Sequence, residues 1–282
     1  MTTTVDARRG PAHDVGVDEL RDRAHELRRT MLRMASDKGE GYIAQGLGLA
    51  DALAVLYFRE LELGDDPQWV DRDRFLLSTG HYSLALYAAL HHRGYFDDAE
   101  LAVFGLNGSR LALSTFEDLP GVEMTGGSLG HGLGQGVGMA MASRLTGRPN
   151  RVVVELSDGE MQEGSTWEAA AAASSFRLDH LTAVVDCNGI QADGPLVLDY
   201  EPVADKWAAF GWDVRDIDGN DVAAVCTAFD ELRAPDGRPK AIVLRTAPGH
   251  GIPTLVSRPR SHFVRVEPDE WASLRQELED HR

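Results

Sequence analysis

The chain has few cysteines, a deficit of basic residues and no long apolar run. Its two cysteines, Cys187 and Cys226, are too few for a disulfide framework, so we expect a reducing, cytoplasmic compartment. No stretch of about 18 consecutive apolar residues occurs, so no membrane-spanning helix is expected. The 28 basic and 45 acidic residues give a net charge of −17, which argues against a nucleic-acid partner because phosphate binding needs clustered Lys and Arg.

The composition is that of a folded domain. Of the 282 residues, 43% are hydrophobic, which is enough for a sizeable core. Residues 1–16 lack the apolar segment of a secretory signal peptide, and we expect them to be a disordered tail. Neither an internal repeat nor a low-complexity linker divides the rest, so residues 17–282 are expected to form a single domain.

Helical and β-branched segments alternate along the chain. Strands are expected at residues 74–78, 151–156, 181–185, 212–215 and 241–245. Helices are expected at residues 18–36, 47–58, 82–93, 97–105, 129–145, 166–176, 222–232 and 268–280. Residues 106–128 and 248–265 carry Gly and Pro and are expected to be irregular. This alternation is typical of an α/β fold in which a mostly parallel sheet has helices on both faces.

Two polar residues, Asp158 and Asn188, follow neighbouring predicted strands, one βαβ unit apart. Since the carboxyl ends of parallel strands open on the same edge of a sheet, we expect both side chains at a ligand-binding edge. One carboxylate, one amide oxygen and a nearby backbone carbonyl suit a hard cation such as Mg²⁺, which takes its remaining ligands from phosphate and water. Gly159, directly after Asp158, lets the backbone approach a phosphate closely.

The same segment resembles the thiamine diphosphate fingerprint, Gly-Asp-Gly followed after a helix and a strand by Asn. Here 28 residues lie between Gly159 and Asn188, and Ser157 stands in place of the first Gly. The detail resembles transketolase: Asp-Gly-x-x-Gln-Glu-Gly, then Trp-Glu-Ala, then Asn-x-Ile-x-x-Asp-Gly. The resemblance implies a thiamine diphosphate-binding fold of the diphosphate-binding (PP) type. It also implies that Mg²⁺, or Ca²⁺ or Mn²⁺ in its place, is held by Asp158, Asn188 and the Ile190 carbonyl.

A glycine-rich run at residues 126–136 enters a predicted helix, where backbone N–H groups can bind phosphate. A dinucleotide site is the weaker interpretation, because no clear strand precedes the run and no acidic residue follows at the required spacing. The run resembles the transketolase loop that contacts the rings of the cofactor, which implies that Gly127, Ser128 and Leu129 bind it. The later glycines are equally explained by close helix packing.

Two histidines and a glutamate match further family positions. His81 follows a predicted strand in Ser-x-Gly-His, and His262 lies in the loop after Pro-Gly-His-Gly-Ile. The resemblance implies that His81 contacts the diphosphate and the reacting centre, and that His262 binds the diphosphate and the substrate. Glu163 would join an acidic network that reaches a catalytic glutamate of a partner subunit. Glu168 is nearly as well explained by the helix dipole, and His250 is interpreted as an incidental loop residue.

The sequence departs from the family at two further histidines. Tyr42 stands where the first is expected, and the segment around Ser114 and Thr115 lacks the second. A phenol is a poor base at neutral pH, and Phe263 replaces a family glycine. These departures are compatible with cofactor binding but argue against the ordinary handling of ketose phosphates. We therefore expect an unusual donor or acceptor in a specialised biosynthetic pathway.

The resemblance covers roughly residues 17–270, the diphosphate-binding third of a full transketolase. It implies the N-terminal subunit of a split transketolase, a transferase of carbohydrate metabolism. Such a subunit would be active only with a C-terminal subunit carrying the pyrimidine-binding domain, as an α2β2 heterotetramer. The pair would move a two-carbon ketol unit from a ketose or ketose phosphate to an aldose or a non-standard acceptor.

Three alternatives stay open at this point. The first is a 2-oxoacid dehydrogenase E1-like component that loads a two-carbon unit onto a carrier. The second is a non-catalytic protein that retains the fold, against which the intact set of Asp158, Asn188 and Ile190 argues. The third and weakest is a nicotinamide-dependent dehydrogenase built on the glycine-rich run.

Overall fold

A computed structural model of the chain describes residues 14–192, 194–259 and 261–282, so most of the expected tail lies outside the described residues. The helices are α1 (Val17–Lys38), α2 (Ile43–Val55), α3 (Ser83–His92), α4 (Asp98–Leu101), α5 (Gly132–Thr146), α6 (Gly164–Ser175), α7 (Val203–Ala209), α8 (Val222–Leu232), α9 (Pro253–Val256) and α10 (Trp271–Asp280). The strands are β1 (Glu40–Gly41), β2 (Arg74–Leu77), β3 (Val152–Ser157), β4 (Leu181–Cys187), β5 (Ile190–Gln191), β6 (Gly194–Pro195), β7 (Asp213–Asp218), β8 (Lys240–Arg245) and β9 (Val264–Arg265). A π-helical turn (Leu56–Glu60) extends α2, and a 3₁₀ turn (Gly159–Gln162) follows β3.

Five strands form a parallel sheet in the order β2-β3-β4-β8-β7. The register pairs Val152 of β3 with Arg74 of β2 and with Leu181 of β4. All residues of β3 are buried, and all but Thr182 in β4, as expected for central strands covered on both faces. The predicted mostly parallel α/β sheet is therefore confirmed.

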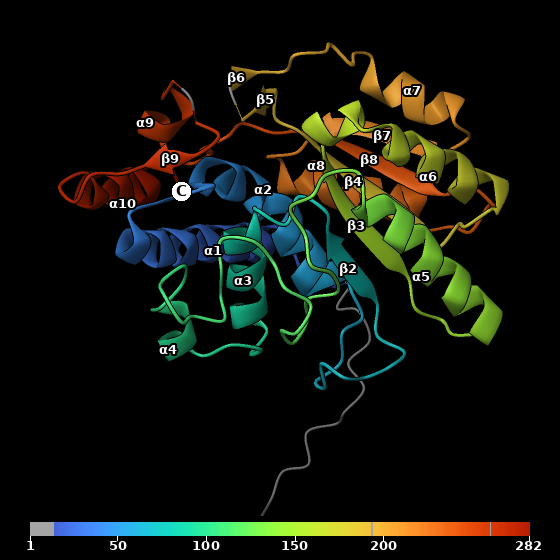
Figure 1. Cartoon of the computed structure of the whole chain (residues 1–282), viewed down its shortest axis with the longest axis horizontal. Helices are drawn as coiled ribbons and strands as arrows, with labels where there is room; N and C mark the ends of the chain where they lie inside the picture. The colour runs from blue at the N-terminus through green and yellow to red at the C-terminus, as the bar shows by residue number, and fades with distance from the viewer. Residues whose placement is uncertain (1–13, 193, 260) are drawn as a thin grey trace, which may run out of the picture.

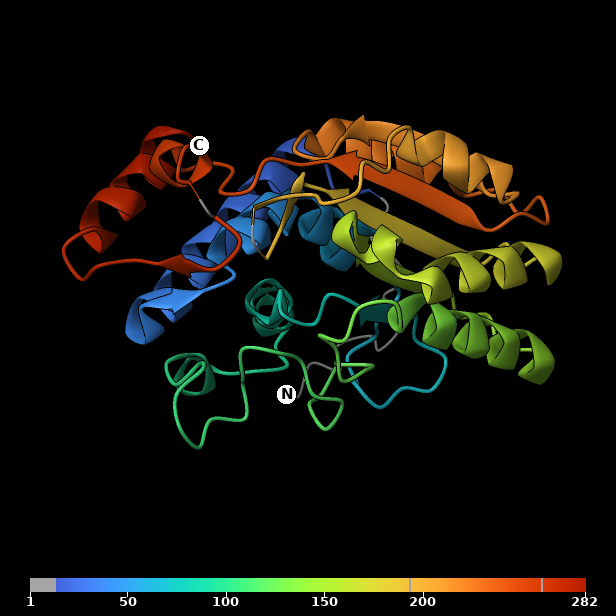
Figure 2. The ribbon, with the colours of Figure 1, turned by 45° about the horizontal axis from the view of Figure 1, so that its top comes forward.

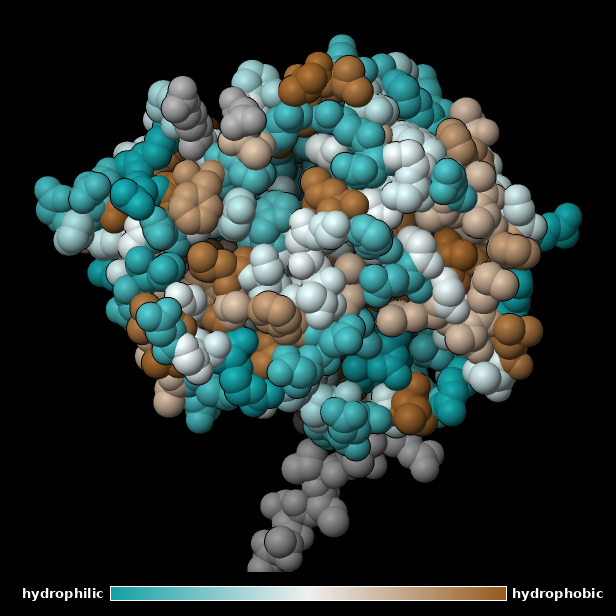
Figure 3. Space-filling view, viewed as in Figure 1, coloured by the Kyte–Doolittle hydropathy of each residue, from teal (hydrophilic) through white to brown (hydrophobic). Residues whose placement is uncertain are grey.

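Helices cover both faces of this sheet (Figures 1 and 2). Alternate strand residues point to opposite sides, so Val153 and Val184 pack in one core with α1, α2, α3 and α8. Val154 and Val185 pack in a second core with α5, α6 and α7. On the surface drawn in Figure 3, hydrophobic side chains are scattered among polar ones rather than gathered into one patch. No helix among the described residues is long and apolar enough to cross a membrane.

The expectation that residues 248–265 are irregular is wrong, because they contain α9 and β9. Strand β9 pairs antiparallel with β1, with Gly41 opposite Val264. Strands of two residues leave no periodic pattern in a sequence, which explains why neither was predicted. Helix α7 likewise has no counterpart among the predicted elements.

The predicted helix at residues 129–145 begins three residues later, at Gly132. The segment before it is a loop in which Gly127 and Gly130 adopt φ angles of 111° and 83°, a region that other residues rarely enter. The glycine-rich run is thus divided between a loop and the first turns of α5. Most other predicted helices and strands are present with ends displaced by a few residues.

The end of β2 meets the glycine loop through direct backbone contact. Gly80 and Gly126 lie so close that a Cβ atom on either residue would overlap the backbone of the other. A Cβ on Gly132 would likewise overlap the side chain of Ser78. His81 directly follows Gly80, so these contacts place it beside the glycine loop.

We expect Gly80→Ala to destabilise the fold by about 2–3 kcal/mol, because the added methyl group overlaps Gly126 and Gly127. Gly134→Ala is the matched control, since a Cβ there meets no atom within 4 Å and alanine favours a helix by about 1 kcal/mol over glycine. Urea unfolding of the two variants measures the difference. Equal stability would contradict the backbone contact.

Candidate active site

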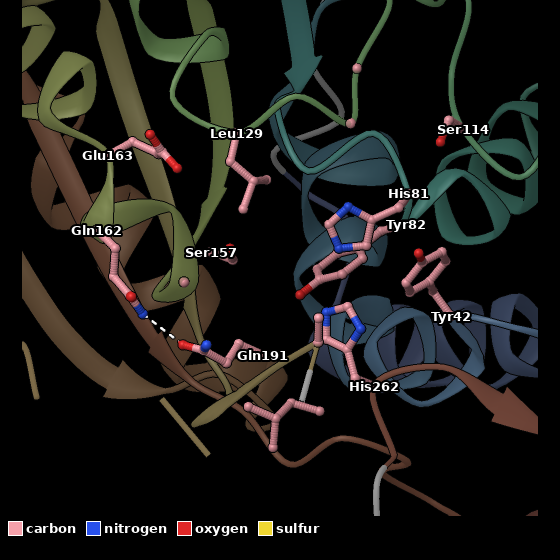
Figure 4. A pocket seen from close by; sticks show the side chains of 15 residues that line it. Tyr42, His81, Tyr82, Ser114, Leu129, Ser157, Gln162, Glu163, Gln191 and His262 are labelled. Atoms are coloured by element: carbon pink, nitrogen blue, oxygen red, sulfur yellow. Dashed lines mark hydrogen bonds between the residues drawn. The ribbon is translucent and has the colours of Figure 1, made fainter. Parts of the chain in front are cut away.

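A cavity of about 540 Å³ opens at the carboxyl ends of β2, β3 and β4, a size suited to a cofactor or small-molecule site (Figure 4). In Figure 4, Gln162 and Glu163 lie across the cavity from Tyr42, His81 and His262. Segments far apart in the chain supply the lining, which consists of Tyr42, His81, Tyr82, Ser114, Gly126, Gly127, Leu129, Ser157, Gly159, Gln162, Glu163, Ile190, Gln191, Ala192 and His262.

Asp158 lies at the end of β3, between two lining residues, and is only 3% exposed. Its carboxylate oxygens accept hydrogen bonds from the backbone N–H groups of Gly159 and Gly189, at 2.8 and 2.7 Å. Burial raises the pKa of Asp158 to about 7, and among the described residues the principal effects that oppose it are backbone hydrogen bonds rather than cationic side chains. A bound cation would favour the charged carboxylate and remove the cost of burying it.

Asn188, just after β4, holds its amide in a fixed orientation. Its Nδ2 donates to the Tyr82 hydroxyl at 3.0 Å and to Asp186 Oδ2 at 2.7 Å, so both N–H bonds are used. Its Oδ1 accepts from the Ile190 N–H at 3.1 Å, which leaves one lone pair of that oxygen for a further ligand.

The donor chemistry of this edge fits a hard divalent cation. The structure places Asp158 and Asn188 at the ends of neighbouring strands, and Ile190 lines the cavity beside them. No group of three or more His, Cys, Asp or Glu side chains that could hold a metal ion is found in the described ranges. A cation held by one carboxylate, one amide and one backbone carbonyl would need phosphate and water to complete its shell, as Mg²⁺ commonly does.

Two histidines line the opposite side of the cavity, with ring centroids 5.5 Å apart. Burial, with a smaller contribution from His262, lowers the pKa of His81 to about 3, so its ring is neutral at pH 7. A neutral imidazole donates one hydrogen bond and accepts another. The structure therefore brings His81 and His262 together as groups that can orient a ligand.

The glycine loop forms another part of the lining, through Gly127 and Leu129. Ser128, which lies between them, is exposed and does not line the cavity, so the structure does not bring this predicted cofactor-binding residue to the lining. Glu163 lines the cavity and remains exposed, whereas Glu168 is exposed on α6 outside the lining.

Glu160 holds three segments of the site together, a role that sequence reasoning missed. It is fully buried, and its Oε1 accepts hydrogen bonds from the Gly130 N–H at 2.7 Å and from the Ser78 hydroxyl. Ser78 Oγ in turn accepts from the Gly132 N–H at 3.0 Å. The end of β2, the glycine loop and the 3₁₀ turn are thereby joined. A glutamate in an acidic turn gives no sequence signal of such burial.

Both positions at which the sequence departs from the expected histidines lie in the lining, as Tyr42 and Ser114. The Tyr42 ring packs against His81 and His262, with centroid distances of 4.6 and 5.3 Å. Phe263 packs on the same ring at 5.2 Å. The departures therefore change the surface that a ligand in this cavity meets.

We expect the stability difference between wild type and Glu160→Gln to depend on pH in the metal-free chain. Burial raises the pKa of Glu160 to about 7, above its value of about 4.3 in an unfolded chain. Between these values the folded state holds more protons, so the wild type loses stability as pH rises. Relative to Glu160→Gln, the wild type should lose about 3 kcal/mol of its free energy of unfolding between pH 4 and 8. Urea unfolding of both proteins across this pH range measures the loss. A pH-independent difference would contradict this assignment.

Sequence comparison identifies relatives over nearly the whole chain. The family described as "Transketolase, thiamine diphosphate binding domain" matches residues 21–281. A putative uncharacterized transketolase family protein of Sinorhizobium fredii is 51% identical over 258 residues, which cover 90% of this chain and 92% of that protein. A 6-deoxy-6-sulfo-D-fructose transketolase subunit of Clostridium sp. is 37% identical over 265 residues, covering 93% of this chain and 96% of the relative.

Solved structures share the fold. A transketolase from Campylobacter jejuni superposes with a TM-score of 0.87 at 28% identity, over 94% of this chain and 43% of its own length. A transketolase from Leishmania mexicana gives 0.84 at 28% identity, over 94% and 41%. The chain thus spans about two fifths of the length of these structures, although it matches the subunit from Clostridium almost end to end.

Proposed function

The chain belongs to the transketolase family, and from this premise we propose that it is the diphosphate-binding subunit of a split transketolase. Residues 17–282 would act as one thiamine diphosphate-binding domain. Together with a partner subunit, the chain would transfer a two-carbon ketol unit from a ketose or ketose phosphate to an aldose or a non-standard acceptor. Family membership leaves the nicotinamide-dependent dehydrogenase without support.

The observation that carries this proposal is the buried carboxylate of Asp158 at the cavity edge. Its burial without a compensating cation in the described residues would be costly for an empty surface groove. A buried carboxylate of this kind is expected at a site that binds Mg²⁺. Asp158, Asn188 and the Ile190 carbonyl would hold the cation and, through it, a diphosphate. The Gly159 backbone would lie beside the same diphosphate.

Thiamine diphosphate supplies, when bound, the carbon nucleophile needed to cleave a ketose between C2 and C3. The residues of this chain would bind and orient the reactants around it. His81, neutral at pH 7, would donate and accept hydrogen bonds at the diphosphate and the reacting end of the substrate. His262 would bind the diphosphate and the substrate from the same side. Gly127, Ser128 and Leu129 would border the cofactor rings through the glycine loop.

A partner subunit would complete the site. The C-terminal subunit of the proposed pair would carry the pyrimidine-binding domain, and the assembly would be an α2β2 heterotetramer with the cofactor at the interface. Two observations support this arrangement. Relatives named as transketolase subunits match this chain over 96% and 99% of their own lengths. Glu163 also remains exposed at the cavity edge, where a carboxylate of the partner could approach it.

The substrate is proposed to differ from ordinary ketose phosphates. Tyr42 and Ser114 line the cavity where the family pattern predicts histidines. Relatives are named for unusual sugars, 6-deoxy-6-sulfo-D-fructose and apulose 4-phosphate, which supports a specialised role for this chain as well. Pyruvate tested beside ketoses would separate ketol transfer from an E1-like activity.

We expect calorimetry to detect Mg²⁺-dependent thiamine diphosphate binding when the chain is assembled with the pyrimidine-domain protein encoded nearest to it. Asp158→Asn should weaken binding by at least about ten-fold, because it removes the only carboxylate of the proposed metal site. Asp65→Asn, on the exposed surface, is the matched control and should bind as the wild type does. If no partner confers binding, the proposed function is wrong.

We expect the assembled wild type to use xylulose 5-phosphate poorly as donor. Tyr42→His should raise kcat/KM for this sugar by about ten-fold, because it restores an imidazole, which can both transfer a proton near neutral pH and hydrogen-bond to the sugar hydroxyl groups, where the phenol is a poor base. Steady-state kinetics with a fixed aldose acceptor measure the change. Efficient use of xylulose 5-phosphate by the wild type would show that the departures at Tyr42 and Ser114 do not alter the donor.

A further inference from the structure

One side of the cavity is lined by the rings of Tyr42, His81, Tyr82 and His262, and Phe263 packs on Tyr42 just outside the lining; these five rings are here called the aromatic wall. Figure 4 shows the four of them that line the cavity. Tyr42 is central, with ring centroids 4.6 Å from His81, 5.3 Å from His262 and 5.2 Å from Phe263. Tyr82 continues the wall from His81 at 4.6 Å. Edge-to-face packing of this kind fixes the rings relative to one another.

The pairing of β1 with β9 builds the outer half of this wall. Tyr42 directly follows β1 and Phe263 directly precedes β9, and the register places Gly41 opposite Val264. Backbone pairing therefore sets the two rings side by side. The Gln45 side chain also donates to the His262 carbonyl at 2.8 Å, which fastens the same segment to α2.

Where Phe263 packs on the Tyr42 ring, the aromatic wall offers a ligand carbon surface beside the phenol hydroxyl. Phe263 has no hydrogen-bonding side-chain group and remains 43% exposed beside Tyr42. Leu129 and Ile190 add aliphatic surface elsewhere in the lining. A hydroxyl group pressed against such a surface loses its hydrogen bonds to water, whereas an alkyl group gains by leaving water.

We propose that Tyr42 and Phe263 are specificity-determining residues, which favour an aldehyde acceptor with an alkyl or deoxy segment over one that is hydroxylated at the same position. This inference rests on the proposed ketol transfer and concerns its substrate. In the acceptor step, the aldehyde carbon forms a bond to the two-carbon unit and the carbonyl oxygen takes up a proton. Cleavage of the donor is the reverse of this step, so the aldehyde that it releases would contact the same aromatic wall.

The expected preference is about ten-fold. Apolar pockets discriminate by about 10–200-fold for one methylene, and by about 100-fold against an isostere with an added hydroxyl. The aromatic wall is partly exposed and includes a phenol, so it belongs at the lower end of this range.

The test uses the assembled, cofactor-loaded complex with 3-hydroxypyruvate as donor, which delivers the two-carbon unit with release of CO₂ and uptake of one proton. The acceptors are propanal and glycolaldehyde, which have the same number of heavy atoms and differ by a methyl in place of a hydroxyl group. We expect the ratio of their kcat/KM values to favour propanal in the wild type. It should fall by about ten-fold in Tyr42→His and in Phe263→Ala.

Phe176→Ala is the matched control, because Phe176 is similarly exposed, at 45%, but lies at the end of α6, whereas Phe263 packs on the cavity-lining ring of Tyr42. It should leave the ratio unchanged. A second readout does not depend on turnover: in saturation-transfer NMR without donor, irradiation of aromatic protons should reach the propanal methyl group. This transfer should weaken in Phe263→Ala and persist in Phe176→Ala.

The outcomes separate the two proposals. Without CO₂ release from hydroxypyruvate by the wild-type complex, the proposed function fails and this inference fails with it. With CO₂ release, a propanal-to-glycolaldehyde ratio that stays the same in Tyr42→His and Phe263→Ala would overturn the inference alone. A fall in the ratio in both variants, with no change in Phe176→Ala, supports it.

Discussion

The site depends on the burial of four carboxyl groups at one edge of the sheet. Glu155, Asp158, Glu160 and Asp186 are each at most 3% exposed, and burial raises the pKa of every one of them. No cationic side chain of the described residues is among the principal causes of these shifts. Because an unpaired charge is costly in a protein interior, this edge must either retain protons or take up a cation. Cation binding at this edge would therefore be coupled to folding.

The same carboxyl groups also position the parts of the site. Glu155 accepts a hydrogen bond from the Thr79 hydroxyl at 2.7 Å, and Glu160 accepts from Ser78 and from the Gly130 N–H. The turn that carries His81 is thus held from two sides, and close backbone contact at Gly80 completes the attachment. Buried carboxyl groups normally destabilise a core, but here their hydrogen bonds fix the geometry around the cavity. The same edge would gain stability from a cation that neutralised it.

The sequence predicted the position of Asp158 and Asn188 at the strand ends better than the surroundings of the cavity, such as Glu160 and Phe263. Buried strands leave strong apolar signals, so the relative placement of Asp158 and Asn188 followed from the rule that parallel strands end at one edge. The burial of Glu160 was not predictable, because only tertiary contact distinguishes it from an exposed acidic turn. The placement of Phe263 beside Tyr42 depends on strands of two residues, which are too short for periodicity to reveal. Local patterns therefore gave the α/β fold and the placement of Asp158 and Asn188 at neighbouring strand ends, but not the packing of rings at the rim of the cavity.

On the proposed assembly, the charge at this edge also bears on subunit association. A cation and a diphosphate held by this chain would lie at the interface, so they would stabilise both the fold and the complex. Linkage then requires reciprocity: if the partner raises the affinity for the cofactor, the cofactor raises the affinity for the partner by the same factor. The buried carboxylate of Asp158 makes this coupling strong, because without the cation its charge disfavours the folded chain. A subunit with such an edge would reach its full stability only when it is loaded and assembled.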